Sequence, residues 1–261
     1  MKKKKILLSG LIALMCCAVS AFGEAKDPNS NKISVELTSS LAGKYIWRGQ
    51  NLSDDPVFQP GLNIGYGKLT AGLWGNMDLS NINGNSGDMS EIDYSLDYSD
   101  NFGCLEWLGY SVGAIYYDFP GTAIGDTTEI YGGLSLDIPL SPSVKLYHDV
   151  DEADGSYVSL AVGHSIEKIA DIGPGLLPIG LDLGASLGWA SGSYDKYYWG
   201  TDQSKMQDLT FVASFPTEII GFDVAMNLNY VMLVSDDIRD MDTYGTASDF
   251  FFVSLSLTKS F

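Results

Sequence analysis

The stretch FFFVSLSLTKSF, residues 250–261, decides the fold because it reads as one β-strand with two different faces. Apolar residues recur at every second position from Phe251 to Leu257, and the positions between them from Ser254 onward carry hydroxyl side chains. Successive side chains of a strand point to opposite faces, so this segment has an apolar and a polar face. The chain ends on Phe261, which extends the apolar row past one interruption at Lys259.

The final aromatic residue gives this segment a likeness to a particular kind of strand. It resembles the last strand of bacterial outer-membrane barrels, where a terminal Phe serves as part of the assembly signal. Phe261 is therefore predicted to be an assembly signal, with the barrel-assembly machinery as a partner. An ordinary edge strand at the end of a soluble β protein is the alternative interpretation.

Residues 1–23 predict a secretory signal peptide. Residues 2–5 are all lysine, residues 6–22 carry no charge, and small residues follow, so cleavage is expected after Ala21, Gly23 or Ala25. Cys16 and Cys17 leave open a lipid-anchored N-terminus, although Met15 suits lipoprotein processing poorly. The chain is thus divided into a cleaved signal, residues 1–23, and one domain, residues 24–261.

The mature chain is strongly acidic. The signal holds four of the 15 bases and none of the 33 acids, so its removal changes the formal net charge from −18 to −22. With no basic patch, nucleic acid is excluded as a partner of the usual electrostatic kind. Cys104 becomes the one remaining thiol, which excludes an intrachain disulfide and a cysteine metal cluster. No cofactor and no metal are predicted.

The remaining sequence predicts an all-β chain. No apolar run beyond the signal approaches the roughly 18 residues of a membrane helix. The 29 Gly, 15 Tyr and 11 Phe occur at alternating spacing, interrupted by polar clusters. About twelve strands are predicted, over residues 33–47, 57–66, 69–79, 91–98, 105–117, 127–138, 144–150, 156–166, 179–190, 207–215, 222–234 and 250–261.

Connection lengths and strand faces together favour a barrel. Long connections follow odd strands and short ones mostly follow even strands, as in barrels with both termini in the periplasm. Residues 167–178 are the exception, and they predict a small helix, a plug or a different register. The polar faces carry small residues, such as Asp182 and Gly184 beside outward Leu183, which suits the inside of a closed barrel. We expect a closed antiparallel transmembrane β-barrel of about twelve strands, with a soluble secreted β protein as the alternative.

Three segments carry a resemblance to a known family. They are YIWRGQ at residues 45–50 with the Pro- and Gln-bearing segment 56–61, AGLWGNMD at residues 71–78, and EIDY at residues 91–94. Their order and spacing resemble the opening of the TorF-type porins, over about the first third of the mature chain. The resemblance implies an outer-membrane protein of porin type whose substrate is itself uncharacterised.

Charged residues with inward parity are the candidate pore lining. Bases of that parity are few, namely Lys44, Arg48 and Lys145. Rings of carboxylates favour cations in a pore, although the same acids also serve simply to hydrate a lumen. Arg48 is either a constriction residue or half of an ion pair that anchors a loop. The inward acids are Asp78, Asp93, Asp97, Asp137, Asp182, Asp208 and Asp223.

Two further patterns bear on a metal site and on an enzymatic activity. Acid clusters at residues 149–154 and 236–242 lack the calcium-loop spacing, so solvated loop charge is the favoured interpretation. His148 is expected opposite Ser156 on the outer side of the barrel, which is a partial requirement for a lipase. With no orienting group visible, an interfacial histidine is favoured and no enzymatic activity is predicted.

The predicted function is a porin-like channel in the outer membrane of a Gram-negative cell. It would carry small solutes by passive diffusion with a preference for cations, in contact with outer-membrane lipid. The alternative is a structural or adhesive barrel without transport. No substrate, lumen state or oligomeric state is predicted.

Overall fold

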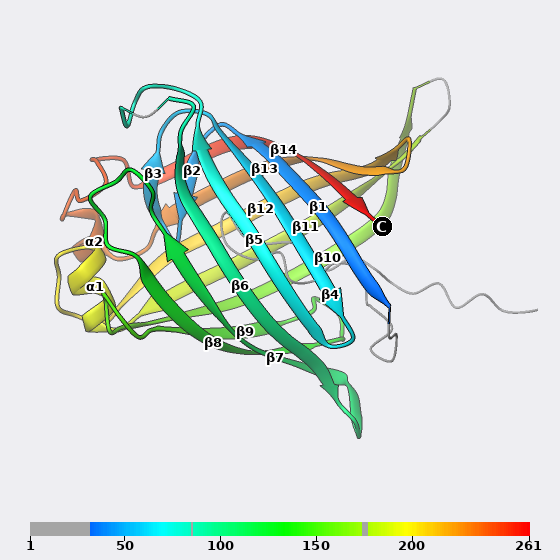
Figure 1. The fold of residues 1–261 in the computed structure, drawn as a ribbon, viewed down its shortest axis with the longest axis horizontal. Coiled ribbons are helices and arrows are strands. Elements are labelled where there is room, and N and C mark those ends of the chain that lie inside the picture. Colours follow the sequence, from blue (N-terminus) through cyan, green and yellow to red (C-terminus); the bar gives the residue numbers. More distant parts are fainter. Residues whose placement is uncertain (1–31, 85, 174–176) are drawn as a thin grey trace, which may run out of the picture.

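The computed structural model describes residues 32–84, 86–173 and 177–261, and these form a closed antiparallel β-barrel (Figure 1). Within these ranges twelve strands make the ring, and it closes where the first strand pairs with the last. The predicted fold class is confirmed; the predicted signal peptide lies outside the described residues. The barrel strands are β1 (Ile33–Ala42), β4 (Val57–Tyr66), β5 (Leu69–Asp78), β6 (Met89–Phe102), β7 (Leu105–Asp118), β8 (Thr127–Leu136), β9 (Ser143–Asp149), β10 (Ser156–Ile172), β11 (Leu177–Ala190), β12 (Lys205–Ile219), β13 (Phe222–Leu233) and β14 (Asp249–Ser260).

The first predicted strand, residues 33–47, is wrong beyond Ala42. There β1 ends, and the following residues form a separate hairpin of β2 (Tyr45–Trp47) and β3 (Gln50–Ser53). Gly43 still donates its N–H to the Val253 carbonyl at 2.9 Å, and beyond it the chain leaves the ring. Residues 45–47 pair with residues 50–53 instead of with the neighbouring barrel strands. Two short helices, α1 (Gly192–Tyr198) and α2 (Asp236–Arg239), lie in later connections.

The two faces of the barrel wall differ as the alternation predicts. On β14 the side chains of Phe251 and Leu255 are 60% and 53% exposed, whereas Phe250 and Phe252 are buried. The outer face is therefore apolar and uncovered, while the inner face holds the buried side chains. This is the reverse of a soluble protein, whose exposed sheet face is polar.

The connections sort by length between the two ends of the barrel. The long ones, together with the β2–β3 hairpin, α1 and α2, gather at one end, which we call the loop end (Figure 1). Short turns, such as residues 67–68 and 220–221, lie at the opposite end with the C-terminus, which we call the turn end. This confirms the predicted split. Neither helix in the described ranges has the length and apolarity to cross a membrane.

The exceptional connection at residues 167–178 consists largely of strand. β10 continues to Ile172 and β11 begins at Leu177, with a register irregularity between Ile166 and Ala170. The predicted helix or plug at this position is wrong for the described residues, and the alternative of a different register holds. Residues 174–176 lie outside them.

Candidate functional site

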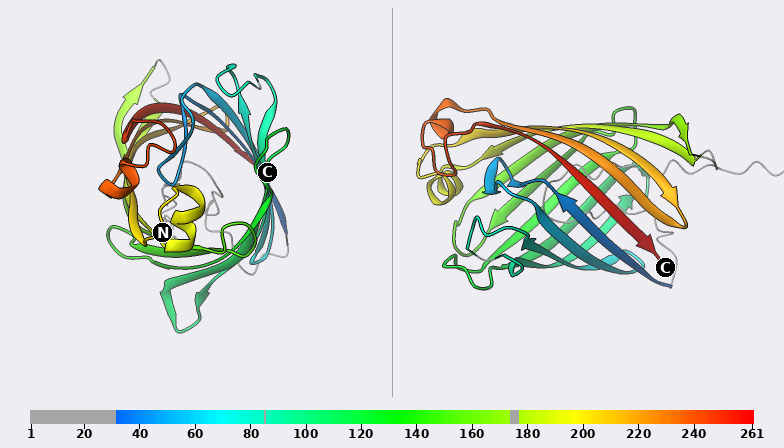
Figure 2. Two further views of the ribbon diagram at one scale, coloured as in Figure 1. Left: turned by 90° about the vertical axis from the view of Figure 1, so that its left-hand side faces the viewer. Right: turned by 90° about the horizontal axis from the view of Figure 1, so that it is seen from above.

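The loop end of the barrel is occupied by the β2–β3 hairpin. Its turn consists of Arg48 and Gly49, which both have positive φ, 48° and 83°, as a two-residue hairpin turn of the type I′ kind requires. A side chain at Gly49 would come within 2.7 Å of Leu233 Cδ2, so the turn also needs glycine for space. Viewed from this end, the hairpin and α1 lie inside the ring of strands (Figure 2).

Arg48 joins the tip of the hairpin to the barrel wall. Its Nη1 and Nη2 donate to the two carboxylate oxygens of Glu129, on β8, at 2.6 and 2.7 Å. Both side chains are at most 2% exposed. The guanidinium carbon also lies 4.4 Å from the ring centroids of Trp47 and Tyr157, within the range of cation–π attraction. The anchoring ion pair, one of the two roles predicted for Arg48, is the role that these contacts favour.

Tyrosines surround the ion pair between Arg48 and Glu129 and help to hold the hairpin in the barrel. Tyr117 donates its hydroxyl to Glu129 at 2.8 Å, so the carboxylate is bonded from two sides. Tyr194, on α1, lies within hydrogen-bond distance of Arg48 and Gln50, at 3.4 and 3.3 Å. We call the β2–β3 hairpin and α1 together the plug. Glu129 and the surrounding tyrosines hold it to the barrel wall.

Helix α1 carries a buried acid of its own. Asp195 Oδ1 accepts a hydrogen bond from Gln207 at 2.5 Å, while its Oδ2 has no hydrogen-bond partner in the described part of the chain. Burial raises the pKa of Asp195 to about 7, and the bond from Gln207 only partly offsets this effect. The seat of α1 in the barrel thus contains a group that titrates near neutral pH.

Acidic residues descend from the plug along the inner face of β6. Glu91 accepts a hydrogen bond from Tyr45 at 2.5 Å, and Asp97 accepts one from Tyr131 at 2.6 Å. Between them lies Asp93, which is 2% exposed and whose two carboxylate oxygens have no hydrogen-bond partner among the described residues. We call Glu91, Asp93 and Asp97 the acid ladder.

The other predicted pore-lining acids lie in three different places. Asp208 is buried near the plug, where Tyr157 donates to it at 2.9 Å, and Asp78 accepts a bond from Asn83 at 2.9 Å at the loop end. Asp182 is half-buried in β11. Asp137 and Asp223 are exposed at the turn end, so the structure does not bring them to the plug.

Sequence reasoning missed Glu91 and Glu129. Ile92 and Ile130 belong to the outer row of their strands, so the adjacent Glu91 and Glu129 have inward parity. This parity was the sequence signal that could have identified both acids. It also misplaced Lys44, which pairs with Asp54 beside the hairpin instead of lining the lumen.

The predicted pairing of His148 with Ser156 is present on the outer rim. His148 Nδ1 lies 3.0 Å from Ser156 Oγ, and its Nε2 lies 3.8 Å from the carboxylate of Asp154. The backbone N–H of Ser156 donates to Ser191 Oγ at 2.9 Å, so it is not free to stabilise an oxyanion. This contact is an ordinary cross-strand pair at the barrel rim.

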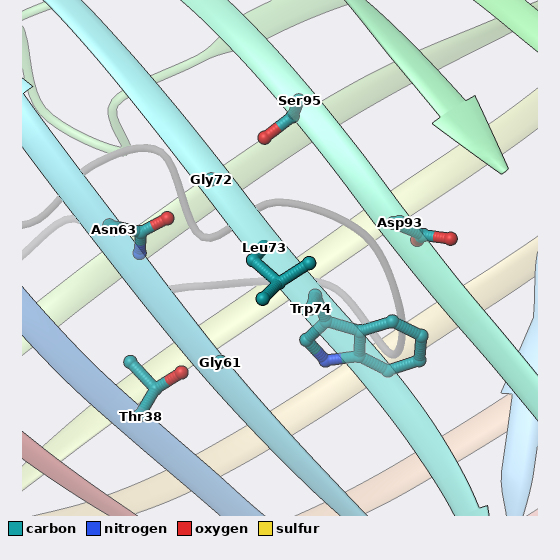
Figure 3. A pocket seen from close by; sticks show the side chains of 8 residues that line it. All are labelled: Thr38, Gly61, Asn63, Gly72, Leu73, Trp74, Asp93 and Ser95. Carbon is teal, nitrogen blue, oxygen red and sulfur yellow. The ribbon is translucent and has the colours of Figure 1, made fainter. Parts of the chain in front are cut away.

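A small cavity adjoins the acid ladder. It has a volume of about 20 Å³ and lies on the inner wall, where it is lined by Asp93 and Ser95 on β6, Trp74 on β5 and Thr38 on β1 (Figure 3). In the described ranges no three His, Cys, Asp or Glu side chains are grouped so that they could hold a metal ion.

Solved structures with a similar overall path are outer-membrane proteins of low sequence identity. A NanC porin is 11% identical, covers 86% of this chain and 97% of its own, and has a TM-score of 0.47. An outer membrane channel from Pseudomonas putida F1 is 10% identical, with 88% and 94% covered and a TM-score of 0.43. A bacterial polysaccharide outer membrane secretin is 10% identical, with 88% and 99% covered and a TM-score of 0.46.

Sequence comparison places the chain in a family without assigning it an activity. No curated protein sequence matches it. Residues 25–173, more than half of the chain, match a bacterial family of unknown function called Gcw_chp. That description does not use the TorF name, so the resemblance to TorF-type porins stays a prediction. The protein belongs to the Gcw_chp family.

Proposed function

We propose that this protein is a porin-like channel of the bacterial outer membrane that passes small solutes and prefers cations. Support comes first from the outer face, where apolar side chains such as Leu183 and Phe211 are uncovered. Lipid is the environment that suits such a face, and closure of the ring leaves no unpaired strand edge in it. The partners in this proposal are lipid, the assembly machinery and the solute, and no enzymatic activity is part of it.

The acid ladder is the observation that carries the cation preference. Its three carboxylates face inward from one strand, while the nearest inward bases are Arg48, already bound to Glu129, and Lys145. Lys145 lies over the ring of Tyr131, 4.2 Å from its centroid. Acidic side chains therefore outnumber bases along this wall, and those that are ionised lower the barrier for positive ions.

The plug limits what such a channel can pass. Arg48, Glu129 and the tyrosines around them are buried, so the loop end is constricted by packed side chains. In this proposal small solutes pass while the hairpin is seated, and larger ones require it to move. We therefore infer a narrow conduit rather than a wide diffusion pore.

Planar-bilayer recording tests this proposal. A potassium chloride gradient across folded protein should give a reversal potential of the sign expected for cations. Changing Asp97 and Asp182 together to Asn should move that potential toward zero, while Asp240→Asn in an exposed loop, the matched control, should leave it unchanged. Anion preference, or no conductance from barrels that are demonstrably folded, would contradict the proposal.

One observation favours a second candidate, a barrel without transport. The same buried ion pair that constricts the loop end also fixes the hairpin inside the barrel. A structural or adhesive barrel would be stabilised by such a hairpin and would present its loops to the exterior. Wild-type barrels that never conduct, beside conducting variants that lack the hairpin, would support this candidate.

A further inference from the structure

We propose that Asp93 binds a compact monovalent cation, of the size of an ammonium head group, in the small cavity beneath the plug. This inference rests on the proposed cation-preferring channel and specifies the class of solute that it would hold. Its starting point is the buried carboxylate of Asp93, to which no N–H or hydroxyl group of the described residues donates a hydrogen bond. Buried charges in proteins are paired, so this one requires a positive partner or a proton.

Among the described residues, Arg48 is the base whose charge acts on Asp93. Arg48 directs both of its terminal nitrogens at Glu129. The neighbouring acid on the strand, Glu91, lies close enough to share a hydrogen bond with Asp93, but only if one of the two is protonated. Without a proton, Glu91 and Asp93 repel each other, and a cation would relieve that repulsion.

Aromatic rings flank Asp93 on both neighbouring strands. The residue directly opposite it on β5 is Trp74, and the one opposite it on β7 is Tyr117. In Figure 3 the indole of Trp74 lies on the inner wall between its own strand and β6, the strand that carries Asp93. A cation against an aromatic ring gains attraction from the π-electrons in addition to the carboxylate charge. Carboxylate and indole together are therefore suited to an ammonium group.

The size of the cavity limits the ligand. A volume of about 20 Å³ is room for about one water-sized group, since a water needs roughly 10–15 Å³ by the same measure. Gly72 keeps this space open, because a side chain there would clash with Ser95 and come within 3.0 Å of Asn63 Oδ1. The hydroxyl groups of Thr38 and Ser95 and the amide of Asn63 also line the cavity and supply oxygen atoms for a cation. Ammonium, a primary amine or an alkali ion fits, whereas a quaternary ammonium group does not.

Tryptophan fluorescence of the detergent-refolded barrel measures this binding directly. Methylammonium chloride, added at constant ionic strength, should give a saturable change that disappears in Trp74→Phe, which identifies the reporter. Asp93→Asn should weaken binding at least tenfold, while the control Asp240→Asn should leave it unchanged. Gly72→Ala fills the cavity but keeps the carboxylate, and it should also weaken binding.

The arms of the experiment separate the possible ligands. Saturation by sodium or potassium chloride as well as methylammonium would assign the site to compact cations in general, and saturation by methylammonium alone to amines. Equal binding of tetramethylammonium would overturn the size argument. No saturable signal, or equal binding by heat-modifiable, folded Asp93→Asn protein, would overturn the site and leave Asp93 protonated instead.

Reversal potentials of the same preparations distinguish this inference from the channel proposal. Binding that depends on Asp93 in barrels without conductance would retain the site and reject the channel. Cation selectivity without binding at Asp93 would retain the channel and place its selectivity elsewhere.

Discussion

Arg48 combines two interactions that are individually costly to lose. Its charge satisfies the buried carboxylate of Glu129, and its planar guanidinium packs against Trp47, Tyr147 and Tyr157. A lysine would supply the charge without the bidentate geometry or the flat surface. The hairpin tip therefore depends on arginine specifically.

Replacing Arg48 tests how strongly the plug is held. Arg48→Met keeps most of the side-chain volume but leaves Glu129 charged and buried without its cation. Removing one partner of a buried pair costs about 3–5 kcal/mol, so the free energy of unfolding should fall by that amount. Urea unfolding in detergent micelles measures it.

The double variant Arg48→Met with Glu129→Gln provides the control. Because it removes both charges, it should recover part of the lost stability. A loss below about 1 kcal/mol in Arg48→Met, as measured for exposed pairs, would mean that solvent reaches the pair.

The charge of Asp195 predicts how the seat of α1 depends on pH. In an unfolded chain the pKa of an aspartate is about 4, whereas in the folded barrel the pKa of Asp195 is about 7. The folded state thus holds the proton more strongly, so stability should decrease as pH rises from about 4 to 7 and stay low above that. Thermal unfolding of wild type and Asp195→Asn across this range checks the sign. The variant should flatten the decrease; parallel curves would disprove the assignment.

For single residues, the sequence predicted which face of a strand a side chain occupies better than it predicted the hydrogen bonds of that side chain. Parity places Asp93 and Asp97 on the inner face, because side chains alternate strictly along a strand. It does not indicate that Tyr131, 34 residues away, bonds Asp97 while Asp93 stays unbonded. Those outcomes depend on cross-strand register and on the hairpin, neither of which is encoded locally.

The β2–β3 hairpin is the element that turns the barrel from an open tube into a constricted one. Sequence analysis assigned its first half to strand one, since Tyr45, Ile46 and Trp47 continue an apolar strand pattern. The dipeptide Arg48–Gly49 was the missed signal, because a two-residue connection ending in glycine is typical of a tight hairpin. Whether such a hairpin folds inward depends on its contacts with β8, which local sequence does not reveal.

Removing the hairpin should open the loop end. Replacing residues 45–53 by a short Gly-Ser linker deletes Arg48 and admits water to Glu129, so the exposed carboxylate no longer carries a burial cost. Single-channel conductance should rise several-fold. Shortening the exposed loop at residues 121–124 is the matched control and should leave conductance unchanged. Equal conductance in both variants would show that the plug is not the constriction.

The architecture of the whole molecule follows from the alternation of side chains along each strand and from the closure of the ring of strands. A ring of paired strands leaves no edge, and its outer face is apolar, so lipid rather than a second sheet is the natural cover. Strand alternation and connection lengths are repeated over the whole chain, and this repetition explains why the architecture could be predicted from sequence. The plug could not, because it is a single irregular event at one end.

Closure of the barrel depends on the end of the chain. Phe261 exchanges two backbone hydrogen bonds with Val35, at 2.9 and 3.4 Å, and its ring is 71% exposed on the outside. These backbone bonds extend the seam between β1 and β14, while the exposed ring is the part that the assembly-signal hypothesis concerns. Phe261→Ser keeps the backbone bonds and removes the ring, so it separates the two roles.

We expect Phe261→Ser to lower the yield of assembled barrel several-fold and Phe261→Tyr to restore it, because the assembly-signal hypothesis assigns the role to the aromatic ring. Deleting Phe261 removes the ring and both seam bonds, and should lower the yield further. Heat-modifiable migration of membrane fractions on gels measures the assembled barrel, and deletion of one residue from the exposed loop at residues 240–245 is the control. If Phe261→Ser assembles as well as wild type while the deletion does not, the terminal residue acts through the seam alone and the assembly-signal hypothesis fails.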